Sequence, residues 1–322
     1  MCQLIFSNLK DKKLNSLAVY TLATKGVSTY NKDGFGLFST DCGIKKTKIP
    51  ASCITNLGNF IRNGLVTSAP VIAHIRQSSF KNKNLIDDEH AHPFETEKLV
   101  LAHNGTLEFE DWKKNNDVKY KNMIDSQMFL TELNERYTDN LITALQETML
   151  EFDGKFAFLI YDKIKKRFYV IRGSTATLFR DDVILKDSAN KNLGFVLDTD
   201  KETLEEGILV LNNLIQLTLG FPIEYDSAKI TEIEKESIFI LDEKGEELIK
   251  AGELKETTKA YTTTTYYKNY NAGFMRGDLY SEEEYMDERW WDKGKNKINV
   301  AVELTENEKL LTSLMNDWYI SL

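Results

Sequence analysis

Cysteine is scarce in this sequence: only Cys2, Cys42 and Cys53 occur among 322 residues. So few cysteines, in an odd number, exclude a disulfide framework and favour a reducing compartment. Proline is also rare, with four residues, which indicates few rigid loops. The fold is therefore expected to depend on a hydrophobic core rather than on cross-links.

Long apolar runs and nucleotide-binding motifs are missing too. No stretch reaches the roughly 18 apolar residues of a membrane-spanning helix, and no basic segment followed by an apolar one marks a secretory signal. Neither G-x-x-x-x-G-K-[ST] nor G-x-G-x-x-G occurs. We therefore expect a cytoplasmic protein with no membrane segment, no cofactor and no ATP-dependent activation by this chain.

The charge balance is acidic. Lysine and arginine number 41 against 50 aspartates and glutamates, which gives a formal net charge of -9. A broad nucleic-acid interface needs a basic surface, so nucleic acid is not an expected partner. The hydrophobic fraction of 42% and the charged fraction of 28% are ordinary for a globular chain.

Hydrophobic periodicity predicts short strands at 1–7, 70–77 and 98–105, and helices at 51–65, 126–137 and 140–152. Ser126 and Asp125 are both candidates for the N-cap of the helix at 126–137. After Gly154 the pattern becomes that of strands. Strands are predicted at 155–162, 167–173, 194–200, 207–213, 213–219 and 235–242. Paired strands with segregated helices indicate an α+β layered fold.

The last part of the chain differs in composition. Residues 256–273 have low complexity and read as a linker, whereas residues 307–320 carry one apolar helical face. We expect one domain at 1–250, followed by a tail at 251–322 with a short amphipathic helix.

Cys2 is the first residue that could carry chemistry. Removal of Met1, which is common before a small residue, would place a thiol and a free α-amine on the same residue. An α-amine has a pKa of roughly 7.7–8.0, so a useful fraction is neutral near pH 7 and can accept the thiol proton. The alternative is that Cys2 is a small hydrophobic residue in a buried first strand.

Three of the four histidines lie in "AHIRQSS" (73–79) and in "AHPFETEKLVLAHNGTLEF" (91–109). In "HNG", the Asn104 side chain and the Gly105 backbone offer two N–H donors that could form an oxyanion hole. The alternative is an Asn-Gly turn that closes a hairpin. A metal site is not favoured, because the histidines fall on different predicted elements.

Six short motifs occur in an order that resembles a known family. They are Cys2, "DGFG" (33–36), "AHIRQ" (73–77), "AHPF" (91–94), "AHNG" (102–105) and "IDSQ" (124–127). Together they resemble class II glutamine amidotransferases, which are N-terminal-nucleophile hydrolases, and are most similar to the stand-alone YafJ-like group. The resemblance covers roughly residues 1–225. It implies a four-layer αββα sandwich, here with a partly extended C-terminal tail, and makes 1–250 a glutaminase domain.

The resemblance also implies roles for catalytic residues. Cys2 would attack the side-chain amide of glutamine, with its own α-amine as general base and then acid. Asn104 and Gly105 would bind the oxyanion. Many family members begin with Cys-Gly, whereas this chain has Gln3 after the nucleophile.

Substrate-binding roles follow in the same way. Arg76 would hold the α-carboxylate of glutamine and Asp125 the α-ammonium group, with Ser79 a further contact to the same zwitterion. His74 and His103 belong to this set as the scaffold of the site rather than as catalysts. Later in the chain, Arg172 and Ser174 are weaker candidates for contacts to the pocket.

L-Glutamine is thus the expected substrate. No synthetase, isomerase or phosphoribosyl domain is readable after the motifs, so an ammonia-accepting synthetase is expected as a separate partner. Two alternatives remain: a γ-glutamyl amidohydrolase that acts on another small conjugate, and a catalytically silent interaction protein of the same fold.

Overall fold

The computed structural model describes residues 2–29, 33–47, 69–78, 87–109, 111, 117–186, 190–219, 222–223 and 229–254. All of them belong to the first of two compact units of the chain, Met1–Thr257. The predicted helix at 51–65 and the predicted tail elements lie outside the described residues.

The first layer of strands is an antiparallel seven-stranded sheet, sheet A, in the order β11-β9-β10-β1-β4-β2-β3. Its strands are β1 (Gln3–Leu9), β2 (Gly34–Ser39), β3 (Gly43–Thr47), β4 (Val71–Arg76), β9 (Phe179–Leu185), β10 (Lys191–Asp198) and β11 (Thr231–Glu232). The central strands β1 and β4 are buried along their whole length. The start of β1 lies beside the end of β4 because the two strands run antiparallel, with Gln3 opposite Ile75.

Sheet B is an antiparallel six-stranded sheet in the order β13-β12-β8-β7-β6-β5. Its strands are β5 (Phe94–Glu95), β6 (Leu99–Phe109), β7 (Phe152–Asp162), β8 (Arg167–Arg172), β12 (Ser237–Leu241) and β13 (Leu248–Glu253). Strands β7 and β8 confirm the hairpin predicted from the sequence. The predicted strand at 98–105 is present but continues to Phe109 in β6.

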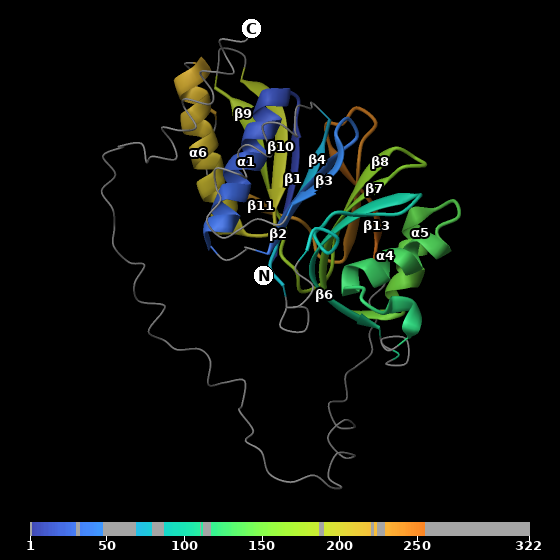
Figure 1. Ribbon diagram of the computed structural model, residues 1–322. Helices are drawn as coiled ribbons and strands as arrows, with labels where there is room; N and C mark the ends of the chain where they lie inside the picture. The colour runs from blue at the N-terminus through green and yellow to red at the C-terminus, as the bar shows by residue number, and fades with distance from the viewer. Residues whose placement is uncertain are drawn as a thin grey trace. The chain divides into compact units, whose positions relative to one another are not determined.

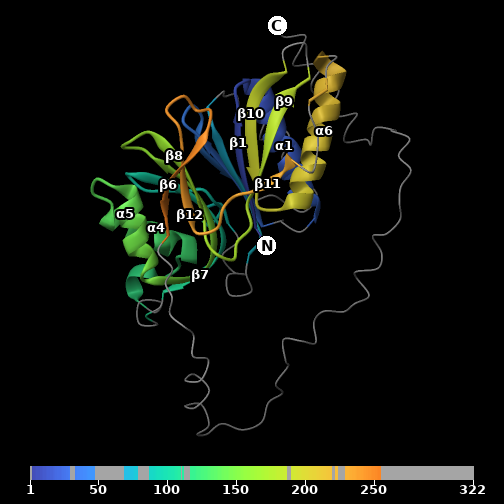
Figure 2. The same cartoon turned by 180° about the vertical axis from the view of Figure 1, so that it is seen from behind.

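Helices cover the outer face of each sheet. Helices α1 (Lys12–Thr29) and α6 (Lys201–Leu219) pack on sheet A, and helices α4 (Asp125–Arg136) and α5 (Leu141–Met149) pack on sheet B. A 3-10 turn, η2 (Val118–Tyr120), precedes α4. Figures 1 and 2 show the order helices, sheet A, sheet B, helices from two opposite sides. The four-layer αββα sandwich expected from the sequence is confirmed.

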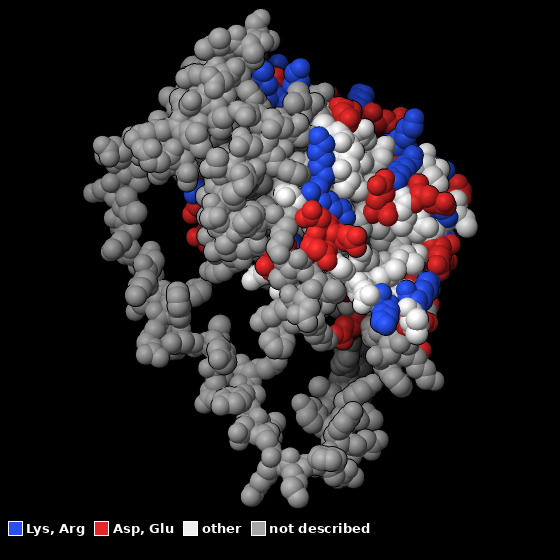
Figure 3. Space-filling view, viewed as in Figure 1, with Lys and Arg blue, Asp and Glu red and all other residues white. Residues whose placement is uncertain are grey.

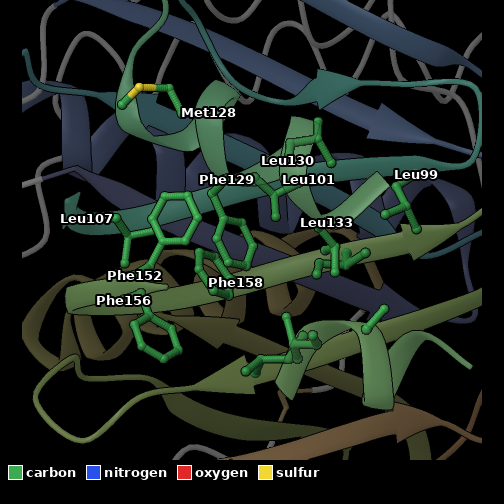
Figure 4. Packing of buried hydrophobic residues seen from close by; sticks show 14 of the residues in the cluster. Leu99, Leu101, Leu107, Met128, Phe129, Leu130, Leu133, Phe152, Phe156 and Phe158 are labelled. Carbon is green, nitrogen blue, oxygen red and sulfur yellow. The ribbon is translucent and has the colours of Figure 1, made fainter. Parts of the chain in front are cut away.

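Two hydrophobic clusters hold these layers together. One lies between the sheets and joins Leu4 and Phe6 of β1 to Val100 and Ala102 of β6. The other lies between sheet B and its helices, where the ring of Phe129 stacks on that of Phe158 at 4.6 Å (Figure 4). Complete burial of one such side chain is worth about 1.5–3 kcal/mol, so both faces of β6 are anchored.

Two predictions about helices are wrong. The predicted strands at 207–213 and 213–219 are both part of α6, whose buried residues Leu204, Ile208, Leu211 and Ile215 recur at helical spacing. The N-cap of α4 is Ile124, not Ser126 or Asp125; the Gln127 side chain accepts the Ile124 N–H at 3.0 Å. The Asp125 carboxylate is therefore available for other contacts.

Charged side chains are mixed on the surface. On the described part of the face in Figure 3, lysine and arginine lie interspersed with aspartate and glutamate. Among the described helices, none has the length and apolarity that a membrane span requires.

Candidate active site

Cys2 lies immediately before β1, next to the end of β4. Its thiol donates to the Gln77 carbonyl oxygen and accepts from the Gln77 N–H, both at 3.3 Å. Burial raises the pKa of this thiol; the Gln77 contact and the Arg76 charge oppose the shift, and the Asp125 charge adds to it. The thiol is thus held in its neutral form, so attack on a substrate requires a base that removes its proton.

Arg76 is the last residue of β4 and is 3% exposed. Burial lowers the pKa of its guanidinium, and the nearby charges of Asp33, Asp87 and Asp125 oppose that shift. Asp33 is fixed to the end of β4, because its N–H donates to the Arg76 carbonyl at 3.0 Å and its carboxylate accepts the Ser78 N–H at 2.7 Å. The Arg76 guanidinium is thus a buried cation in the field of the Asp33, Asp87 and Asp125 carboxylates.

Asp125 begins α4 and connects that helix to β6. Its carboxylate accepts the Leu107 N–H and the Ser126 N–H, both at 2.9 Å. Because the Asp125 charge acts on both the Cys2 thiol and the Arg76 guanidinium, these three predicted site residues share one electrostatic environment.

Asn104 and Gly105 lie within β6, opposite Ala157 and Phe156 of β7. The alternative that Asn-Gly closes a hairpin is therefore wrong. Gly105 has a φ of 145°, and a Cβ at this position would overlap the Lys155 carbonyl oxygen. Only glycine fits here, two residues before the Leu107 N–H that binds Asp125.

Three buried histidines pack behind these residues. The rings of His74 and His92 are 4.1 Å apart, and those of His92 and His103 are 6.4 Å apart. The Ser126 hydroxyl bridges His92 Nε2 at 2.9 Å and His103 Nδ1 at 2.8 Å. These contacts join β4, β6 and α4.

Burial keeps all three imidazoles neutral. It is the largest cause that lowers the pKa of His74 to about 3 and the pKa of His92 well below the usual range. Burial also lowers the pKa of His103, although the Asp125 charge opposes the shift. Neutral rings can stack closely without charge repulsion, so the cluster is a structural support at neutral pH.

This cluster predicts acid sensitivity. The unfolded chain binds protons at these histidines below about pH 6.5, whereas folded His74 resists protonation down to about pH 3. The stabilisation that comes from keeping these histidines neutral is therefore fully present above about pH 6.5. Below that pH the free energy of unfolding falls, by up to about 1.4 kcal/mol per pH unit for His74 alone. Urea unfolding between pH 7 and 4 measures this slope. His74→Phe should flatten it, and an equal slope in both proteins would contradict the prediction.

Several residues near the site carried no separate signal in the sequence. Contacts that depend on the fold bring four further residues to the site: Asp33, Asp87, His92 and Ser126. Three of them, Asp33, His92 and Ser126, belong to the quoted motifs, and this membership was the one available signal. Ser79 lies outside the described residues. Among the described residues, no group of three or more histidine, cysteine, aspartate or glutamate side chains is arranged to hold a metal ion.

Arg172 has a different position from the one expected. Its guanidinium is buried; Nε donates to the Ala176 carbonyl at 2.7 Å, and the other nitrogens bind the Ile233 carbonyl and Glu232. Arg172 therefore stabilises the loop between β8 and β9 through these hydrogen bonds. Ser174, on the same loop, is exposed.

Comparison with known families identifies the chain. Residues 1–162 match the family described as "Glutamine amidotransferases class-II". The chain belongs to this family. No protein of curated function matches this chain.

Solved structures similar to this chain include the "allosteric regulatory enzyme of purine biosynthesis", at 14% identity and a TM-score of 0.52, with 80% of this chain and 49% of that chain covered. Another is glutamine phosphoribosylpyrophosphate amidotransferase from B. subtilis, at 12% identity, TM-score 0.49 and coverage of 80% and 50%. A third is a glutamine aminotransferase class-II domain protein from Silicibacter pomeroyi, at 11% identity, TM-score 0.45 and coverage of 79% and 100%. The first of these supports the fold. The chain spans about half the length of the first two structures.

Proposed function

We propose that this amidotransferase hydrolyses the side-chain amide of L-glutamine through a γ-glutamyl thioester on Cys2. The observation that carries the proposal is the position of the Cys2 thiol, which hydrogen-bonds the Gln77 backbone and lies in the same electrostatic environment as Arg76 and Asp125. A zwitterionic amino acid needs one cation and one anion next to the nucleophile, and Arg76 and Asp125 supply this pair.

The reaction starts with removal of the thiol proton. Because the pKa of the Cys2 thiol is raised by burial, a base is needed, and the α-amine that Cys2 exposes after loss of Met1 fulfils this role. The sulfur then attacks the amide carbon of glutamine. Asn104 and the Gly105 N–H stabilise the resulting oxyanion, and the α-ammonium returns its proton to the departing ammonia.

The second half of the reaction consumes water. The α-amine accepts a proton from a water molecule, whose oxygen attacks the thioester carbon. The C–S bond breaks, the sulfur regains a proton from the α-ammonium, and glutamate leaves. No net proton is gained by the enzyme.

Substrate recognition and product use complete the proposal. Arg76 binds the α-carboxylate through its planar fork of donors, Asp125 binds the α-ammonium group, and Ser79 is a further proposed contact. Ammonia passes to an acceptor on a separate synthetase partner. The proposed catalytic domain occupies residues 1–250.

The purified protein tests this proposal directly. It should release glutamate and ammonia in equal amounts from glutamine, and Asn104→Ala should lower kcat by about 10²–10³-fold with little change in KM, because the donor acts on the oxyanion rather than on bound glutamine. Thr106→Ala is the matched control, since Thr106 is an exposed residue on the same strand. A wild-type protein that releases no glutamate, or an Asn104→Ala variant of full kcat, would contradict the proposal.

A further inference from the structure

The residue after the nucleophile has an unusual environment. Gln3 is 2% exposed, although it carries a primary amide that loses its water on burial. In β1 it lies between Ile75 of β4 and the end of β10. In a core, protein groups must take the place of water; here they do so for the amide nitrogen, whereas Oε1 has no hydrogen-bond partner among the described residues.

Two acceptors from different elements bind the Gln3 amide nitrogen. Nε2 donates to Asp198 Oδ2 at 2.5 Å and to the Leu22 carbonyl oxygen at 3.3 Å. Asp198 is the last residue of β10 and is itself fully buried; its other oxygen accepts the Asp200 N–H at 2.9 Å. The Gln3 side chain thus connects the start of β1 to α1 and to β10, which lie side by side in Figure 1.

The other atom of the amide fits against a glycine. Gln3 Oε1 occupies the space where a Cβ would stand on Gly26 of α1, and the Ile75 side chain closes the same space from β4. A residue with a side chain at position 26 is therefore incompatible with Gln3 in this rotamer. Glycine is a poor helix former, so its presence inside α1 agrees with a specific packing requirement.

We infer that Gln3 is a positioning residue for Cys2, held by Asp198 and helix α1 and seated on Gly26. Because Gln3 and Cys2 are consecutive, fixing the Gln3 side chain also fixes the direction in which the Cys2 thiol and α-amine leave the strand. The effect on turnover rests on the proposed glutaminase function, whereas the effect on the geometry of Cys2 does not.

Gly26→Ala tests the inference without touching the site. The added methyl group displaces Gln3, so kcat should fall by about 10- to 100-fold, with KM within threefold of the wild-type value. Alanine is the better helix former, so the loss cannot come from a weaker α1. Gln3→Gly, which removes the positioning side chain, should lower kcat to a similar extent. The double variant Gln3→Gly/Gly26→Ala should have a kcat within threefold of that of Gln3→Gly, because the added methyl group then has no Gln3 side chain to displace.

Gly207→Ala supplies the matched control. A Cβ on Gly207 of α6 would press on the Leu22 side chain and so disturb α1, but it would not enter the space of Gln3 Oε1. Its effect on kcat should be smaller than that of Gly26→Ala and should persist in the Gln3→Gly background. If both glycine variants lose the same activity, or if Gly26→Ala lowers kcat as much in the Gln3→Gly background as in the wild type, α1 packing alone explains the result and the inference is overturned. A Gln3→Gly variant of wild-type kcat would overturn it as well.

A second measurement separates this inference from the proposed function. The rate at which iodoacetamide alkylates Cys2, measured by peptide mass spectrometry relative to Cys42, reports the thiol without any substrate. Gly26→Ala should change the Cys2 rate by at least threefold, and Gln3→Gly should change it to a similar extent with or without Gly26→Ala. If the wild-type protein hydrolyses no glutamine, the proposed function fails while this rate still decides the role of Gln3. An unchanged rate would overturn that role.

Discussion

Replacing Cys2 by alanine is expected to lower glutamine hydrolysis by roughly 10⁴–10⁶-fold, the range associated with loss of a covalent nucleophile. The reason is that the described hydrogen bonds of this side chain are to the Gln77 backbone, so the substitution removes the attacking atom and little else. The free energy of unfolding should change by no more than about 1 kcal/mol. Glutamate release and urea unfolding measure the two effects.

Cys42→Ala is the control for loss of a thiol. Cys42 is also a free, half-exposed cysteine, and it lies in the turn between β2 and β3. This variant should keep full activity. Cys2→Ala should still bind glutamine in calorimetry, because Arg76 and Asp125 remain. Turnover above one tenth of the wild-type rate in Cys2→Ala would refute the thioester route.

The layered fold was predictable because each central element has a clear local pattern. The strand of Gln3–Leu9 is built around the apolar run Leu4–Phe6, and α4 and α5 show helical spacing of buried residues. The order of the six motifs added the fold family. These patterns involve residues that are close in the sequence, so they can be recognised without knowing which distant residues are in contact.

Helix α6 is an element that such local patterns failed to predict. Its sequence "GILVLNNLIQLTL" contains short apolar runs that fit a buried strand as well as a buried helix. What decides between them is the surface available: α6 packs on the outer face of sheet A, against α1, where a helix buries one stripe and leaves Leu209 45% exposed. This surface exists only after the sheet has formed.

The sequence proposed residues for the candidate site but gave no information on their connections. The motifs pointed to Cys2, Arg76, Asn104, Gly105 and Asp125. They did not show that Ser126 bridges two histidines, since that contact requires α4 to pack on β6. The neutrality of the histidines likewise follows from burial between two sheets, which no local pattern reveals. The packing of the Gln3 side chain against Gly26 could not be predicted either, because the two residues are 23 positions apart in the sequence.

A chain that keeps its initiator methionine is expected to lose about 10²–10⁴-fold in kcat, the contribution of a positioned general base. Inserting one lysine between Met1 and Cys2 prevents removal of the methionine, because trimming requires a small second residue. The thiol is then still present, but its pKa is raised by burial and no α-amine is available to accept the proton. Intact mass establishes the amino terminus of each protein, and glutamate release gives kcat.

An amino-terminal extension that ends in a protease site directly before Cys2 provides the control. Cleavage directly before Cys2 restores the free α-amine, so activity should return in proportion to the cleaved fraction. The pH dependence adds an independent signature: kcat/KM of the trimmed enzyme should rise with pH through roughly 7.7–8.0, where an α-amine loses its proton, whereas the uncleaved protein should lack this limb. Full activity with the methionine retained would show that another group removes the thiol proton, and the α-amine mechanism would be wrong. If cleavage restores activity, the loss of activity in the uncleaved protein is due to the missing α-amine, because the rest of the chain is identical before and after cleavage.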